Sequence, residues 1–227
     1  MSAQEEVRAA AEYVRERCPE EPTVGLILGS GLSGLARDLE EPVSIPFADV
    51  PNCPVATVPG HPGQLGLGLL AGRRVAVLIG RLHFCEGYSM AQVVFPTRLL
   101  GHLGCKTLVV TNAAGGLNPL FWPGDLMVIT DHINFLGLAG HNPLAGAEAQ
   151  AFGPRFVDLK DAYDPALIEL AVGAGHKLDD RIGALPIGFH HPAANALGVH
   201  AAMLHEQLGG SELARLPKPR PTWVVTM

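Results

Sequence analysis

The central feature of the chain is the stretch LVVTNAAGGL, which occupies residues 108–117. Its first four residues are apolar or β-branched and leave no side for water, which is typical of a strand buried on both faces of a parallel sheet. Small residues and two glycines follow, so a ligand can approach the main chain closely there. Ligands of open α/β sheets lie at the carboxyl ends of strands. The loop is therefore either a binding loop or a tight turn.

A second strand with a glycine-rich end precedes it, at residues 24–28, and runs into GSGLSG at 29–34. This loop matches the G-x-G-x-x-G pattern of dinucleotide sites. A dinucleotide fold requires a further strand with an acid at its end, about 20 residues later. Prolines break that region here, at IPFADVP (45–51). We expect no dinucleotide, whereas the glycines and Ser30 can offer donors to a phosphate.

A third strand, residues 75–79, leads into GRLH at 80–83. Alternation along an extended segment places Arg81 and His83 on the same side. Two such groups at a strand end suit a phosphate or a carboxylate. The alternative is an ordinary surface pair that binds nothing.

The remaining segments alternate between strands and helices, which predicts an α/β domain. The expected elements are a strand at 126–130 and helices from Ser2 to near Pro19, over 32–39, from Ser89 to Leu103 with a kink at Pro96, and from Asp164 to about Lys177. The segment between them, 135–160, is rich in Gly and Pro without a clear period. A connection this long is uncommon unless it has a function.

Composition excludes several classes of function. The net charge is −6 and no basic run exceeds Arg73-Arg74, so we expect no nucleic-acid partner. No apolar run is long enough to cross a membrane, and the first residues show no signal-peptide pattern. Four scattered cysteines lack metal-ligand spacing, and no carboxylate or cysteine spacing accompanies His190-His191. We therefore expect no metal and a cytoplasmic protein with free thiols.

The three strand ends together resemble the trimeric purine nucleoside phosphorylase family. The resemblance extends in unbroken order over about residues 20–177 and includes VPGH (58–61), EGY (86–88), GD (124–125), DHIN (131–134), NPL (142–144) and DAYD (161–164). Several motifs in one order are far more specific than any single motif.

This resemblance implies a single α/β domain with a mixed, twisted central sheet flanked by helices. It implies reversible phosphorolysis of purine nucleosides, with inorganic phosphate as co-substrate and no other cofactor, in a homotrimer. Arg81 and His83 would be the catalytic residues. The residues that would bind phosphate are Ser30, His61, Arg81, His83 and the Ala113 backbone N–H. The sugar and base region would include Asn112, Cys85 and Phe156, the last reaching a neighbouring subunit.

The chain departs from the family pattern in two places. Cys85 stands where the family usually has an aromatic residue that covers the ribose, and Phe84 is a candidate substitute. Family motifs also end near Lys177, so we divide the chain into a phosphorylase-like domain, 1–177, and a C-terminal segment, 178–227. The segments that bind the base are not found in it. The segment is a divergent working site, a non-catalytic relic or a shifted reading frame, and we favour the last.

Two other functions stay open at this stage. One is a methylthioadenosine phosphorylase, which shares the fold, although the VPGH and NPL segments fit the purine nucleoside enzymes better. The other is a non-catalytic protein that keeps the phosphate site and interacts with a partner. The sequence does not give the base preference, because the base-contacting residues are missing.

Overall fold

The computed structural model describes residues 1–29, 32–57, 62–112, 126–154, 158, 162–182 and 187–189. Its helices and strands, in chain order, are α1 (Ala3–Arg15), β1 (Val24–Leu28), η1 (Ser33–Asp38), β2 (Glu40–Pro46), η2 (Phe47–Asp49), β3 (Gln64–Leu70), β4 (Arg73–Ile79), η3 (Phe84–Glu86), α2 (Met90–Val93), α3 (Phe95–Leu103), β5 (Thr107–Val110), β6 (Leu126–Val128), α4 (Phe135–Leu138), η4 (Ala149–Ala151), α5 (Pro165–Ile182) and β7 (Ile187–Phe189).

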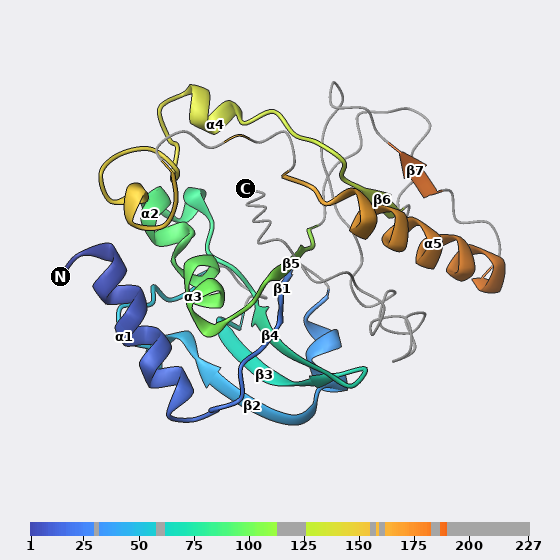
Figure 1. The fold of residues 1–227 in the computed structure, drawn as a ribbon, viewed down its shortest axis with the longest axis horizontal. Coiled ribbons are helices and arrows are strands. Elements are labelled where there is room, and N and C mark those ends of the chain that lie inside the picture. Colours follow the sequence, from blue (N-terminus) through green and yellow to red (C-terminus); the bar gives the residue numbers. More distant parts are fainter. Residues whose placement is uncertain are drawn as a thin grey trace.

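The main sheet has the strand order β2-β3-β4-β1-β5 (Figure 1). β1 is parallel to both β4 and β5, whereas β3 is antiparallel to β2 and β4. The sheet is therefore mixed, as the resemblance predicts. A second, two-stranded sheet pairs β6 with β7 in parallel.

Each face of the main sheet is covered by a different part of the chain. On one face, α1 and α3 pack against alternate strand residues such as Ile27, Leu65 and Leu78. On the other face, η1 and the residues beside it cover Leu28 and Val77. Alternation along β1 thus sends successive side chains into two cores, which is why its sequence is apolar throughout.

Local sequence signals account for the helix starts. Ser2 caps α1: its hydroxyl accepts from the Glu5 amide at 3.3 Å, and the Glu5 carboxylate accepts from the Ser2 amide at 2.7 Å. This confirms the predicted capping box. Asp164 caps α5 in a similar way, by accepting from the Ala166 amide at 2.8 Å.

Four local predictions need correction. The segment 32–39 forms a 3₁₀ helix, η1, rather than an α-helix. The helix predicted to start at Ser89 is interrupted at Val94, which separates α2 from α3. α5 continues past Lys177 to Ile182. The residues of β5 are half-buried rather than fully buried, because β5 is the last strand of the main sheet as described.

The strands β2 and β3 were not predicted, because prolines and glycines interrupt the alternation of apolar and polar residues in them.

The position of β2 in the sheet is relevant to whether the GSGLSG loop could bind a dinucleotide. In a dinucleotide fold the strand that follows the glycine loop lies parallel beside the first strand. Here β2 is antiparallel to β3 and lies at the far edge of the sheet from β5. This topology supports the exclusion of a dinucleotide.

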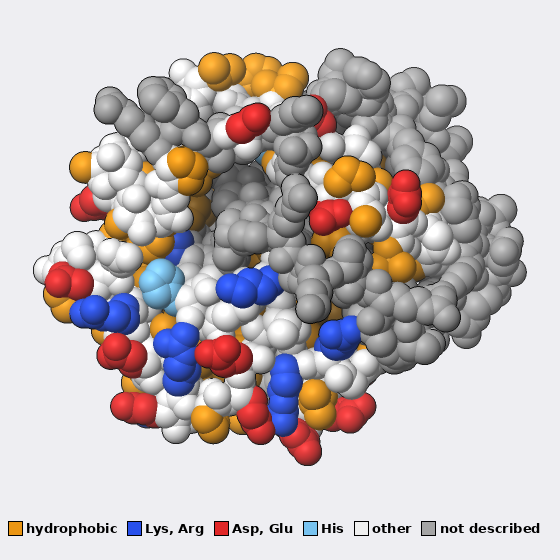
Figure 2. Space-filling model, viewed as in Figure 1, with side chains coloured by type: hydrophobic (Ala, Val, Ile, Leu, Met, Phe, Trp, Pro, Cys, Tyr) orange, Lys and Arg blue, Asp and Glu red, His pale blue; other side chains and the backbone are white. Residues whose placement is uncertain are grey.

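Acidic and basic side chains are interspersed over α1 and the sheet, and apolar side chains gather over α4 (Figure 2). Phe135 and Leu138 of α4 are 70% and 79% exposed. Among the described helices, none is both long and apolar enough to cross a membrane.

Candidate functional site

The carboxyl ends of three parallel strands meet at one edge of the main sheet. Leu28 of β1 lies beside Ile79 of β4, and Ile27 lies beside Val110 of β5. The loops after these strands, which begin at Gly29, Gly80 and Thr111, are thereby brought together. The sequence predicted each strand end separately, and the parallel register confirms that they converge.

Gly29 and Thr111 join two of these strand ends. The Gly29 amide donates to Thr111 Oγ1 at 3.0 Å, and that hydroxyl donates to the Ile27 carbonyl at 3.0 Å. A Cβ atom on Gly29 would lie 2.6 Å from the Thr111 carbonyl oxygen and 2.7 Å from Asn112 Cα. Backbone atoms cannot yield as a side chain would, so this position requires glycine. Thr111 is fully buried, so the junction is closed to solvent at this residue.

Arg81 points from the end of β4 toward the end of β5. Its Nη1 donates to the Thr111 carbonyl at 3.4 Å, and its Nε donates to His83 Nε2 at 3.1 Å. The predicted placement of Arg81 and His83 on one side is confirmed. Within the described residues Arg81 forms no ion pair with a carboxylate, and Nη2 has no hydrogen-bond partner. Nη2 therefore remains as a donor for an anion.

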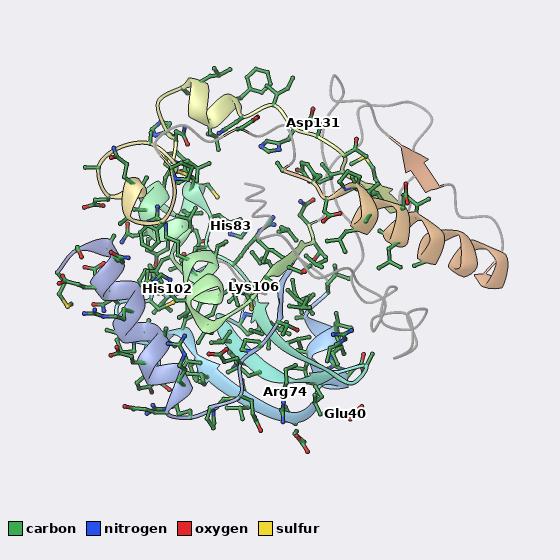
Figure 3. The ribbon with its side chains drawn as sticks, viewed as in Figure 1. Glu40, Arg74, His83, His102, Lys106 and Asp131 are labelled. Carbon is green, nitrogen blue, oxygen red and sulfur yellow. The ribbon has the colours of Figure 1, made fainter. Side chains whose placement is uncertain are left out.

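His83 is held between Arg81 and Glu86. Because its Nε2 accepts from Arg81, the proton resides on Nδ1, which donates to Glu86 Oε1 at 2.9 Å. Glu86 Oε1 also accepts from the His83 amide at 2.7 Å. The short η3 turn makes this spacing possible, since it returns Glu86 to the residue three positions earlier. In Figure 3, His83 lies at the opposite end of the sheet from Arg74 and Glu40.

Electrostatics keep both charges of the site at neutral pH. Burial opposes ionisation of Glu86, but hydrogen bonds from Thr57 and His83 outweigh it and lower the pKa of Glu86 to about 2. Burial also lowers the pKa of Arg81, yet a guanidinium remains protonated in proteins. The arrangement thus offers a half-buried cation beside an oriented imidazole, which is suited to holding an anionic reactant.

Cys85 is exposed, and its neighbour Phe84 is turned toward the long connection. The Phe84 ring is 40% exposed and stacks at a tilt of 50° on His141, with the ring centroids 4.8 Å apart. This contact joins η3 to the segment that follows α4. Whether Phe84 covers a sugar in place of the family's aromatic residue stays a prediction.

Three polar atoms are buried without a hydrogen-bond partner within the described residues: Asn112 Oδ1, His132 Nδ1 and the Tyr163 hydroxyl. The rings of His132 and Tyr163 meet edge to face at 5.7 Å. Burial, together with the charge of Asp131, raises the pKa of Tyr163 to about 12. Tyr163 is therefore neutral at physiological pH. Buried polar atoms without partners are uncommon and often mark a place for water or a ligand.

The predicted site residues divide into two groups. The structure describes Arg81, His83, Cys85 and Asn112, and brings Arg81 and His83 into direct contact. Four further predicted residues lie outside the described residues: Ser30, His61, Ala113 and Phe156. No group of three potential metal ligands gathers in the described part of the chain.

Sequence reasoning missed two residues that shape this site, Thr57 and Thr111. Thr111 was assigned only to a strand, although a hydroxyl at the end of an apolar run is a signal that it bonds to a neighbouring backbone. Thr57 directly precedes the 58–61 motif and gives no local signal. Glu86 was noted only as part of a motif, and its spacing from His83 was the available signal.

Comparison of the sequence with known protein families identifies its family. The sequence model that describes the phosphorylase superfamily matches residues 23–191 of this chain. The chain therefore belongs to the phosphorylase superfamily. The resemblance to purine nucleoside phosphorylases that the motifs carry is confirmed, and the match continues beyond Lys177, where the recognisable motifs end.

Three relatives show the extent of the similarity. The chain is 52% identical to purine nucleoside phosphorylase 1 of Bacillus subtilis over 73% of this chain and 60% of that protein. It is 45% identical to the Rattus norvegicus purine nucleoside phosphorylase over 78% and 61%. A Schistosoma mansoni purine nucleoside phosphorylase isoform, solved with cytosine and ribose-1-phosphate, has a TM-score of 0.76 and 40% identity over 83% and 66%. The chain thus spans about three fifths of the length of its curated relatives.

Proposed function

We propose that the protein is a purine nucleoside phosphorylase. It would cleave purine ribonucleosides and deoxyribonucleosides with inorganic phosphate, giving the free base and ribose or deoxyribose 1-phosphate. The observation that carries the proposal is the contact of Arg81 with His83 at the point where three parallel strands end. The relatives' names and the ribose-1-phosphate in a similar structure support the same reaction.

Phosphate plays two parts in this reaction, as an anion and as a nucleophile. Arg81 neutralises its charge. His83, which holds the guanidinium through Nε2, helps to orient the phosphate below the reacting carbon of the sugar. Ser30, His61 and the Ala113 amide complete the phosphate site in this proposal. As the bond to the base breaks, the sugar gains positive charge, which the adjacent phosphate stabilises before it captures the carbon.

The sugar and base region belongs to the proposal as well. Asn112, at the end of β5, lies next to Thr111 and has a buried oxygen that no described group satisfies. Cys85 and Phe156 complete this region, with Phe156 contributed to a neighbouring subunit of a homotrimer. Phosphate is the only co-substrate, without a metal or organic cofactor. We place the protein in the cytoplasm, which fits its four free cysteines.

A coupled assay on inosine, guanosine and methylthioadenosine, with and without phosphate, tests the reaction. Phosphate-dependent release of hypoxanthine or guanine supports the proposal. Preference for methylthioadenosine indicates the related phosphorylase. Phosphate binding without turnover of any nucleoside indicates a binding protein.

We expect the chain as written to have little activity, because base departure needs hydrogen-bond donors and the sequence after Lys177 lacks the family motifs that supply them. A well-placed donor or acid contributes about 10²–10⁴-fold in rate. Inosine phosphorolysis should be compared between this chain and a version with the reading frame restored after codon 177. Turnover of the unaltered chain at about 1 s⁻¹ or faster would mean that the segment holds a base site after all.

A further inference from the structure

Thr57 binds the buried carboxylate of Glu86 with two donors. Its amide donates to Glu86 Oε2 at 2.7 Å, and its hydroxyl donates to the same oxygen at 2.5 Å. The two residues are 29 positions apart in sequence. The Glu86 side chain is only 3% exposed, although Thr57 itself is exposed. An exposed threonine thus donates two hydrogen bonds to a carboxylate that has little contact with solvent.

The two oxygens of the Glu86 carboxylate accept hydrogen bonds from two different parts of the chain. Oε2 accepts two hydrogen bonds from Thr57, and Oε1 accepts two from His83, one from its amide and one from its ring. Both oxygens are therefore engaged, and the plane of the carboxylate is fixed. Rotation about its terminal bond would break bonds on both sides at once.

The fixed carboxylate sets the proton and the orientation of the His83 ring. With Nδ1–H directed to Oε1, the lone pair of Nε2 faces the Arg81 Nε–H. If the carboxylate rotated, Oε1 would leave Nδ1, and the other tautomer would compete. Fixing a catalytic ring through a hydrogen-bonded carboxylate is a general way to prepare a site before its ligand arrives.

We infer that Thr57 is a positioning residue for the anion site: its hydroxyl locks the Glu86 carboxylate, which locks the His83 ring against Arg81. The same bonds join the residues just before the 58–61 motif to the loop of Arg81 and His83. The inference rests on the proposed function only in that the bound anion is phosphate.

The test compares two substitutions at Thr57. Thr57→Val removes the hydroxyl donor and keeps the shape and the amide, whereas Thr57→Ser keeps the hydroxyl. The primary measurement is the ¹⁵N spectrum of the His83 ring in the full chain without phosphate, assigned with a His83→Asn variant. The second is calorimetric titration with inorganic phosphate.

Tyr88→Phe is the matched control. The Tyr88 hydroxyl donates to the Val55 carbonyl at 2.5 Å, so it also ties the segment before the 58–61 motif to the loop after His83. Among the described residues, the Tyr88 hydroxyl forms no hydrogen bond with Glu86 or with the His83 ring. Loss of this tie loosens the segment without releasing the carboxylate.

We expect Thr57→Val to shift the His83 ring signals toward a mixture of tautomers and to weaken phosphate binding about fivefold. Thr57→Ser and Tyr88→Phe should keep the wild-type ring signals. Ring signals of Thr57→Val that match the wild type would overturn the inference, and so would an equal shift in Tyr88→Phe. If the wild type binds no phosphate, the proposed function fails, while the ring spectra still decide the role of Thr57.

Discussion

Replacing Arg81 with alanine is the most direct perturbation of the site. The guanidinium is half-buried, so solvent screens its charge only weakly. Its Nε and Nη1 are engaged by His83 and Thr111, which aims the remaining nitrogen at a fixed point. The substitution removes a charged donor and also leaves His83 Nε2 without that partner.

The expected loss follows from these contacts. A hydrogen bond to a charged group contributes about 1.5–3 kcal/mol, and each 1.36 kcal/mol corresponds to about tenfold in affinity. Phosphate affinity should therefore fall about 10- to 150-fold. Because the guanidinium is partly shielded and also orients the imidazole, we expect a value in the upper half of that range.

Calorimetric titration with phosphate at constant ionic strength measures this loss. Arg98→Ala is the matched control, since Arg98 is another half-buried arginine whose contacts lie away from the site of Arg81 and His83. Its guanidinium donates to the Pro143 carbonyl at 3.0 Å and lies over the Phe152 ring at 4.2 Å. The control should lower stability but leave phosphate affinity unchanged. Equal affinities of Arg81→Ala and wild type would refute the reasoning, as would an equal loss in the control.

Three further predictions concern stability and assembly. Gly29→Ala should lower the free energy of unfolding by about 1–3 kcal/mol in thermal denaturation, because its Cβ would meet the Thr111 carbonyl oxygen at 2.6 Å; Gly34→Ala, with open space around its Cβ, should cost little, and equal effects would contradict the steric argument. Glu86→Gln should destabilise the protein at neutral pH. The native pKa of Glu86 is about 2 against 4.5 for the free group, so the stabilisation from its charge is fully present above pH 4.5 and is lost as the pH falls toward 2. The difference in unfolding free energy between wild type and variant should shrink over that range, and a constant difference would argue against an ionised native carboxylate. Light scattering of the purified chain at micromolar concentration should give a trimer, whereas a clean monomer would remove Phe156 from the site.

Local signals in the sequence were sufficient for several elements. The Ser2 and Glu5 pair fixed the start of α1, because a capping box acts within a single turn. Apolar runs located β1 and β4, and alternation placed Arg81 beside His83. These features depend on neighbours within a few residues, so no knowledge of the remaining chain was needed.

Other elements could not be predicted from local sequence, because they depend on contacts with residues elsewhere in the chain. β3 reads as a glycine-rich loop, and only pairing with β4 on one side and β2 on the other makes it a strand. The break at Val94 separates α2 from α3 and precedes Pro96, the residue on which the predicted kink was centred. The exposure of β5 depends on which strands flank it, and a single strand does not reveal this.

By itself, the sequence determined the family, the strand ends that carry the candidate phosphate residues, and the caps that start the helices. All of these are encoded by residue type and short spacing. Only the tertiary structure decided which distant groups meet. Gly29 has to be glycine because of Thr111, 82 positions away, and His83 is oriented through Glu86 by Thr57, 29 positions from that glutamate. The first contact is set by the parallel register of β1 with β5. The second is set by the antiparallel pairing of β3 with β4, which places Gln64 at the start of β3 beside Ile79 at the end of β4. Strand pairing thus brings groups far apart in the sequence within hydrogen-bonding distance.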